Sequence, residues 1–206
     1  MPHEWKDPDL HLPPGLDTPA AIQAFLDEIP YSADPFYRCP RRVVLDRKAH
    51  CFDGAVFAAA ALWRLGFPPL LVDMFAWHDD DHILAVFKIE GHWGAIAKSN
   101  YVGLRFREPI HRTLRELMLS YFDDFYNVLR EKTLRSYTLP LNLKAFDRLR
   151  WTIRDEAMEA IAARLDQFRR IPLLTPSMVE RLSLKDRRSY EAGMFGSVPE
   201  GLYKPD

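Results

Sequence analysis

The sequence predicts an α+β fold in which a buried helix leads into an antiparallel sheet. The first observation is the run from Phe52 to Leu65, which is rich in alanine and apolar on nearly every side, as in a buried helix. The second is that Gly66 and a following Pro-Pro pair end this helix. The third is a set of apolar stretches between residues 70 and 98 that are joined by short polar turns, which is typical of antiparallel strands.

Length and charge narrow the class of protein. The chain has 206 residues and a formal net charge of −1, so it suits one domain and gives no bulk electrostatic case for binding nucleic acid or an anionic membrane. No leader-like segment or apolar stretch of membrane-spanning length is present. We therefore expect a cytoplasmic protein whose Cys39 and Cys51 are reduced thiols. We expect residues 1–206 to form a single domain, with a core over about 45–105 and a mostly helical elaboration over about 110–192.

The N-terminal quarter predicts an arm, a helix and an irregular segment. Residues 1–17 are rich in proline and lack periodicity, so we expect an extended arm. Thr18 is a good N-cap and Pro19 suits the first helical position, which predicts a short helix to about Ile29. Residues 30–42 predict an irregular segment that leads to the next helix and forms one wall of a cleft.

The predicted sheet has strands at about 70–75, 82–89 and 92–98. The polar turn 78–81 joins the first two strands, and Glu90-Gly91 joins the last two. If that last loop has two residues, Ile89 faces His92 and His82 faces Ser99. A change of one residue in loop length would place Lys98 or Asn100 opposite His82 instead.

The second half predicts mainly helices. Apolar residues at helical spacing predict helices at about 112–130, 144–170 and 177–190, with a strand at about 133–143 and a loose tail after Gly193. We expect these helices to cover the sheet or one rim of the cleft. The arginines between 148 and 164 are interleaved with acidic residues, which indicates a solvated helix face and not a nucleic-acid surface.

Cys51 is the candidate nucleophile because it lies at the start of the buried helix. Unpaired backbone N–H groups and the helix dipole favour a thiolate there, and the Cys51 N–H can donate to an oxyanion. Free cysteine is also often a small buried hydrophobe. His82 is the candidate base, since it opens a strand beside a loop. It could equally be a surface histidine whose charge is balanced by the acidic turn at 79–81. Asn100 is the candidate orienting residue for the imidazole, or else a plain turn residue.

The order of these features resembles the transglutaminase-like superfamily of papain-type cysteine enzymes. The shared features are a cysteine at a helix start, an alanine-rich helix, Leu-Gly-Phe-Pro-Pro, a strand, a histidine at the next strand start, and Gly-x-Trp at Gly91 to Trp93. The resemblance implies a papain-like core and acyl transfer or amide hydrolysis, with Cys51 as nucleophile and His82 as base. It implies a peptide, protein or small amide substrate and no cofactor.

The chain departs from the family pattern at one position. The family usually carries an aspartate four residues after the tryptophan, and that position is Ala97 here. The orienting role has therefore moved to Ser99 or Asn100, or it is missing. A catalytically inactive module that binds a peptide or protein partner is the second hypothesis.

A metal site is the alternative to the cysteine–histidine chemistry. The run His78-Asp79-Asp80-Asp81-His82, with His50 and Cys51 elsewhere, offers ligand types that suit zinc or a harder cation. Adjacent residues on an extended chain point to opposite sides, however, and no H-E-x-x-H helix or cysteine pair is present. We therefore predict no metal site.

Overall fold

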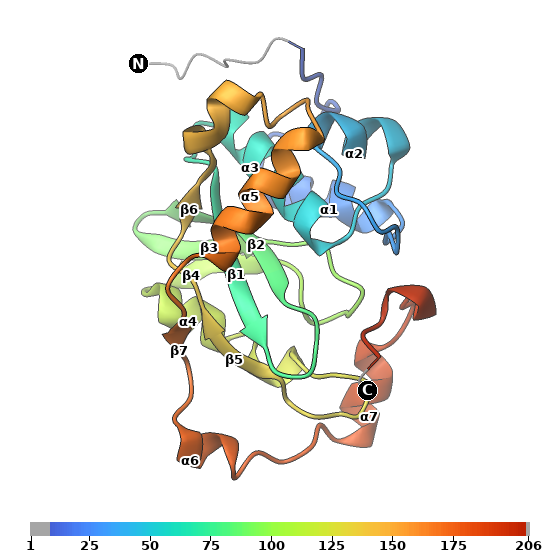
Figure 1. Ribbon diagram of the computed structural model, residues 1–206, viewed down its shortest axis with the longest axis vertical. Helices are drawn as coiled ribbons and strands as arrows, with labels where there is room; N and C mark the ends of the chain where they lie inside the picture. Colours follow the sequence, from blue (N-terminus) through green and yellow to red (C-terminus); the bar gives the residue numbers. More distant parts are fainter. Residues whose placement is uncertain (1–8, 205–206) are drawn as a thin grey trace.

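A computed structural model describes residues 9–204 and has a mixed α/β architecture with an antiparallel sheet (Figure 1). Within those residues the sheet has seven strands in the order β4-β3-β2-β1-β5-β7, with β6 also paired to β1. Every pairing is antiparallel. The strands are β1 (Leu70–Ala76), β2 (His82–Ile89), β3 (His92–Ile96), β4 (Arg107–His111), β5 (Leu134–Tyr137), β6 (Leu141–Asn142) and β7 (Ile171–Pro172).

The central hairpin has the predicted register. Ile89 pairs with His92 across the Glu90-Gly91 turn, and the ladder continues to Ala85 opposite Ile96. Both turn residues have positive φ values, 50° and 82°, as a tight two-residue hairpin loop requires. This register places the first residue of β2 beside the segment that follows β3.

One face of the sheet carries the helices around the predicted cysteine. These are α1 (Pro19–Glu28), α3 (Cys51–Arg64) and α5 (Glu156–Asp166), and their apolar side chains form one core cluster with Leu71, Ala85 and Phe87 of the sheet. In α1 the Thr18 hydroxyl accepts a hydrogen bond from the Ala21 N–H at 3.1 Å, so the predicted cap is confirmed. Figure 1 shows these helices gathered at the upper end of the molecule.

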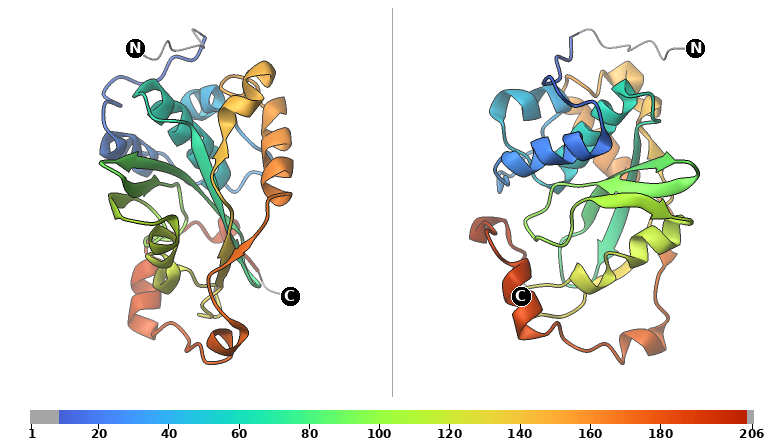
Figure 2. Two further views of the ribbon diagram at one scale, coloured as in Figure 1. Left: turned by 90° about the vertical axis from the view of Figure 1, so that its left-hand side faces the viewer. Right: turned by 180° about the vertical axis from the view of Figure 1, so that it is seen from behind.

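The opposite face of the sheet packs a second core cluster. It combines Val72, Met74 and Leu84 with side chains of α4 (Leu114–Leu119), η1 (Phe122–Asp124) and α7 (Arg187–Gly193), and with the loops between them. The view from behind in Figure 2 shows α7 and the C-terminal segment below α1. The C-terminal segment carries a short turn, η3 (Pro199–Gly201), and packs on the protein, which differs from the loose tail that we predicted.

The segment 30–42 is less irregular than predicted. Pro40 opens a short helix, α2 (Pro40–Asp46), at a first helical position where its missing N–H costs nothing. The helix ends at Arg47, whose φ of 47° lies in the left-handed region. The part before Pro40 does form a wall of a cavity of about 430 Å³ beside Cys51, as expected; we call this the main cavity because Cys51 lines it.

The predicted long helices of the second half are wrong in extent. The segment 112–130 holds only α4 and η1, and β4 precedes it. The segment 144–170 divides into η2 (Leu143–Leu149) and α5, because Arg150 takes a left-handed conformation with φ of 53°. The segment 177–190 divides into α6 (Pro176–Val179) and α7. In the first two segments apolar side chains such as Leu117, Phe125 and Ile161 are buried without one continuous helix, whereas Met178 and Leu184 of the third segment are exposed.

Within residues 9–204, none of the helices has the length and apolar character needed to cross a membrane.

Candidate active site

Cys51 is the first residue of α3, as the sequence predicted. The preceding His50 caps the helix: its Nδ1 accepts a hydrogen bond from the Asp53 N–H at 3.3 Å, while the Asp53 carboxylate accepts one from the His50 N–H at 3.4 Å. This reciprocal arrangement is a capping box with histidine in the place of serine or threonine. Cys51 is partly exposed, whereas Cys39 is buried, and both are free thiols.

A buried ion-pair network holds this helix start in place. The Arg38 backbone N–H donates to Asp53 Oδ1 at 2.7 Å, and the Arg38 guanidinium reaches Asp34, Asp46 and Asp53. Burial raises the pKa of Asp53 to about 7, although the hydrogen bonds from Arg38 and His50 act in the opposite direction. Asp53 is fully buried, so the network fixes the position of Cys51 from inside the protein.

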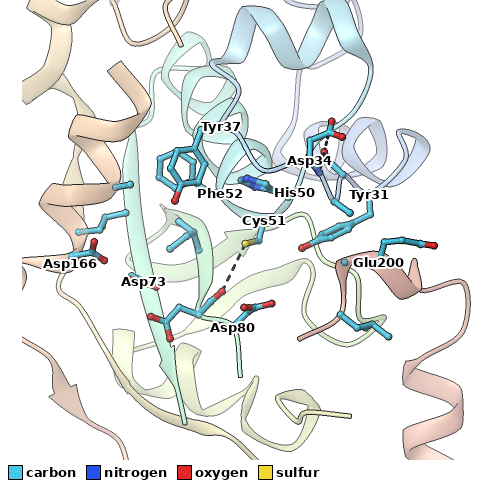
Figure 3. A pocket seen from close by; sticks show the side chains of 18 residues that line it. Tyr31, Asp34, Tyr37, His50, Cys51, Phe52, Asp73, Asp80, Asp166 and Glu200 are labelled. Atoms are coloured by element: carbon cyan, nitrogen blue, oxygen red, sulfur yellow. Dashed lines mark hydrogen bonds between the residues drawn. The ribbon is translucent and has the colours of Figure 1, made fainter. Parts of the chain in front are cut away.

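The Cys51 sulfur lies at a cavity of about 430 Å³ between α3, the start of β2, α5 and the C-terminal segment (Figure 3). Figure 3 shows Tyr31 on one side of the sulfur and the carboxylates of Asp73 and Asp166 on the other. The sulfur is 3.9 Å from the carbonyl oxygen of Asp81, the residue before β2. The nucleophile candidate therefore sits where a substrate can reach it.

His82 opens β2, as predicted, and is buried. Its Nε2 lies 2.9 Å from the carbonyl oxygen of Leu104. Because a carbonyl oxygen only accepts, Nε2 carries the proton and Nδ1 is the free ring nitrogen of the neutral imidazole. His82 and Cys51 both line a small cavity of about 40 Å³ that adjoins the larger one.

Both groups are held neutral in this structure. Burial, together with the charges of Asp80 and Asp53, raises the pKa of the Cys51 thiol to about 12, against the opposing effect of the N–H donors of Ile83 and Phe52. Burial likewise lowers the pKa of His82 to about 4, although the bond to Leu104 opposes that shift. At neutral pH Cys51 is therefore a thiol and His82 a neutral imidazole, and Cys51 is not the thiolate that the helix start alone favours.

Asn100 and Ser99 lie beside His82 in the same small cavity. The Asn100 amide is bonded to the C-terminal segment: its Nδ2 donates to the Val198 carbonyl at 2.9 Å, and its Oδ1 accepts from the Val198 N–H at 2.7 Å. The Ser99 hydroxyl accepts from the Tyr101 N–H at 2.9 Å. An orienting contact from either residue to His82 stays a prediction.

Tyr31 also lines both cavities beside Cys51, and the sequence did not predict this. Residue 31 forms a parallel bridge with Ala49, which brings its side chain beside the helix start. Burial raises the pKa of the Tyr31 phenol far above its ordinary value, whereas the nearby backbone N–H of Cys51 acts in the opposite direction. The only signal in the sequence was an aromatic residue in a proline-rich segment, which by itself indicates no role.

Comparisons with known proteins give a partial likeness only. No protein-family model matches the chain, and no curated protein matches it. Among solved structures, the chain is similar to the EGTA-treated LapG protein of Legionella pneumophila, with a TM-score of 0.30 and 18% sequence identity. The match covers 41% of this chain and 50% of that chain, so it spans about half of the length of that protein. A likeness of this size says nothing about activity.

Proposed function

We propose that this chain is a cysteine-dependent acyl-transfer or amide-hydrolysing enzyme of transglutaminase-like type, with Cys51 as nucleophile and His82 as base. The substrate would be a peptide, a protein or a small amide. The proposal needs no cofactor, since the thiol supplies the nucleophile and the imidazole moves the proton.

The reaction proceeds in two stages. The Cys51 sulfur forms a bond to the acyl carbon while its proton passes to Nδ1 of His82, and the carbon–nitrogen bond then breaks as His82 gives that proton to the leaving amine. Water or a second amine next attacks the thioester, loses a proton to His82 and releases the acyl product. The Cys51 thiol is regained when His82 returns the proton to the sulfur.

The observation that carries the proposal is the tautomer of His82 in a cavity that it shares with Cys51. The Leu104 carbonyl takes the proton-bearing Nε2, so the other ring nitrogen is left as the base. A neutral imidazole is the form that can accept a proton, and the low pKa of His82 keeps it in that form at neutral pH. Catalytic hydrogen bonds are often absent from empty sites and form when the substrate binds.

Two groups are available to hold the oxyanion. The Cys51 N–H is the first, and the Tyr31 hydroxyl beside it is the second. Both residues line the main cavity, where the Cys51 N–H is available to a substrate oxygen. A substrate oxygen that takes this N–H leaves the hydroxyl hydrogen free to donate as well.

A binding module without turnover is the alternative function. The raised pKa of Cys51 and the alanine at position 97 favour it, because a neutral thiol beside a weak base is a poor nucleophile. In that case the same cavity would hold a peptide or a protein partner without reacting with it.

Acylation by p-nitrophenyl acetate separates the two functions. In a Cys39→Ala background, the enzyme should release a burst of nitrophenolate and carry one acetyl group on Cys51, located by mass spectrometry of its peptides. We expect Cys51→Ala to abolish the burst and His82→Ala to slow it by about 100-fold or more. The exposed His11 provides the matched control, since His11→Ala should leave the burst unchanged. Absence of an adduct on Cys51 would leave only the binding module.

A further inference from the structure

Asp73 is a buried carboxylate that the proposed reaction does not use. It lies in the middle of β1, is 3% exposed, and lines the main cavity with Cys51. Its backbone N–H donates to the Thr138 hydroxyl at 3.0 Å. Its Oδ1 has no hydrogen-bond partner among the described residues. A buried carboxylate oxygen without a partner is costly, so its presence at a cavity wall points to a partner that comes from outside.

The surroundings of Asp73 are strongly acidic. Asp81, before β2, and Asp166, at the end of α5, face it, and their charges add to burial in raising its pKa to about 8. Arg170 offsets part of this charge from its place over the Phe75 ring, 3.6 Å from the ring centroid. Figure 3 shows Asp73 and Asp166 on the same side of the Cys51 sulfur, with Asp80 below it. The cavity therefore favours a positive charge.

An apolar strip runs along the same cavity. Ile83 of β2 and Ala162 and Leu165 of α5 line it together with the acidic residues. A chain of methylene groups packs well on such a surface while its charged end reaches a carboxylate. Arginine and lysine side chains have this shape: an aliphatic stem with a cationic head.

We propose that this cavity is a specificity subsite for a cationic side chain, arginine or lysine, of the peptide that donates the acyl group. The head of that side chain binds Asp73 with support from Asp81 and Asp166, and its stem lies along Ile83 and Leu165. The identity of this peptide as an acyl donor rests on the proposed function, whereas its binding in the cavity does not.

Cation binding and ionisation of Asp73 support each other. In the empty cavity Asp73 is largely protonated at neutral pH, since its pKa is raised to about 8. A guanidinium or ammonium head favours the charged carboxylate, so binding should release a proton. The affinity for the cation should therefore rise with pH between about 6 and 8.

Calorimetry with a Cys51→Ala variant tests the subsite without any reaction. The probes are a capped Ala-Arg-Ala peptide and its citrulline analogue, which keeps the shape and loses the charge. We expect the arginine peptide to bind about tenfold or more tightly, as the loss of one charge-assisted hydrogen bond implies. A capped Ala-Lys-Ala peptide and its norleucine analogue should show the same preference. Equal affinities within both pairs, or no binding of any probe, would overturn the subsite.

Substitution of the carboxylate locates the effect. Asp73→Asn should remove most of the preference for arginine over citrulline, and Asp166→Asn should weaken it. Asp17 is exposed and lies outside the cavity, so Asp17→Asn is the matched control. A thermal melt establishes that each variant is folded. If Asp73→Asn and Asp17→Asn behave alike, Asp73 is not the binding group.

A further probe identifies the kind of ligand, and a second variant keeps the two proposals separate. Agmatine carries the guanidinium without a peptide, and we expect it to bind more weakly than Ala-Arg-Ala. Equal affinity would overturn the peptide as occupant in favour of a small amine or guanidine. Binding by Cys51→Ala together with no acylation of the Cys51 thiol would refute the enzyme and keep the subsite. Acylation of the Cys51 thiol without a preference for cationic probes would keep the enzyme and refute the subsite.

Discussion

The Nε2 atom of His82 and the carbonyl oxygen of Leu104 are 2.9 Å apart. This bond fixes the tautomer of the imidazole, which is the task expected of the aspartate in the family pattern that the sequence resembles. A carbonyl group carries no formal charge, so it orients the ring and stabilises an imidazolium less than a carboxylate would. The low pKa of His82 is consistent with that difference.

The first prediction concerns acid stability. The unfolded chain takes up a proton on this histidine below about pH 6.5, whereas folded His82 remains neutral to about pH 4, so the free energy of unfolding falls as the pH drops through this window. The contribution of His82 is up to about 1.4 kcal/mol per pH unit. His82→Gln keeps a donor for Leu104 and should lose this part of the pH dependence. Urea unfolding at pH 7, 6 and 5 measures it.

His50 also has a pKa lowered to about 4 by burial, so the wild type contains at least two such contributions. The quantity to compare is therefore the slope of the free energy of unfolding against pH, in the wild type and in His82→Gln. His11→Gln, on the exposed surface, is the control. An unchanged slope in His82→Gln would mean that the folded protein accepts a proton on His82 near pH 6.5.

The second prediction concerns the reactivity of Cys51. Its pKa of about 12 keeps it a thiol, so iodoacetamide should alkylate Cys51 more slowly at pH 8 than it alkylates a free cysteine with a pKa of roughly 8.5. The rate should continue to rise above pH 9. A Cys39→Ala background isolates the site. A plateau near neutral pH that disappears in His82→Ala would instead reveal a thiolate–imidazolium pair in the empty protein.

The sequence predicted the first half of the fold well, because its signals are local. Thr18 with Pro19, the alanine-rich run and Gly66, and the Glu90-Gly91 turn each specify one element through their own chemistry. The prediction of long helices after residue 110 was wrong because apolar spacing alone cannot distinguish one continuous helix from a series of short turns. The left-handed residue Arg150 and the capping residue Asp186 break the pattern where no glycine or proline marks the break.

The position of Cys51 was predictable, but its electrostatics were not. A helix start favours a thiolate, whereas burial and the nearby charges of Asp53 and Asp80 favour the thiol, and the second effect wins in this structure. These contributions depend on distances that only the fold sets. The spacing of His50 and Asp53 is that of a capping box in which histidine replaces serine or threonine, and it was a local sign of this helix start.

The third prediction concerns Gly54 in the first turns of α3. A Cβ atom at this position would clash with the Cβ of Lys98. Lys98 cannot move away easily, because its Nζ donates to the carbonyl oxygens of Leu26 and Ile29 at 2.7 and 2.5 Å. Glycine to alanine in a helix usually adds up to about 1 kcal/mol of stability. Here we expect Gly54→Ala to cost about 1–3 kcal/mol through overpacking.

Chemical denaturation of a double-mutant cycle tests this clash. Lys98→Gly removes the opposing Cβ, so Gly54→Ala should cost less in that background than in the wild type. Equal costs in the two backgrounds would show that Lys98 is not the obstacle.

The fourth prediction concerns the bond between Asn100 and the C-terminal segment. Asn100→Ala removes both side-chain hydrogen bonds to Val198, each of which contributes about 1 kcal/mol. Local opening of residues 198–202 should then become more frequent, and amide hydrogen exchange there should be about tenfold faster or more. Asn142→Ala is the control, since its side chain accepts a hydrogen bond from the Lys144 N–H in η2.

Loosening this segment should also change access to the nucleophile. Glu200 and Gly201 line the main cavity with Cys51, and Gly201 lies against the Tyr31 ring. Asn100→Ala should therefore raise the rate of Cys51 alkylation at a given pH, while the pH at which that rate rises stays the same. A shift of that pH instead would place Asn100 in the electrostatic environment of the thiol, which is the role that an orienting residue of His82 would have.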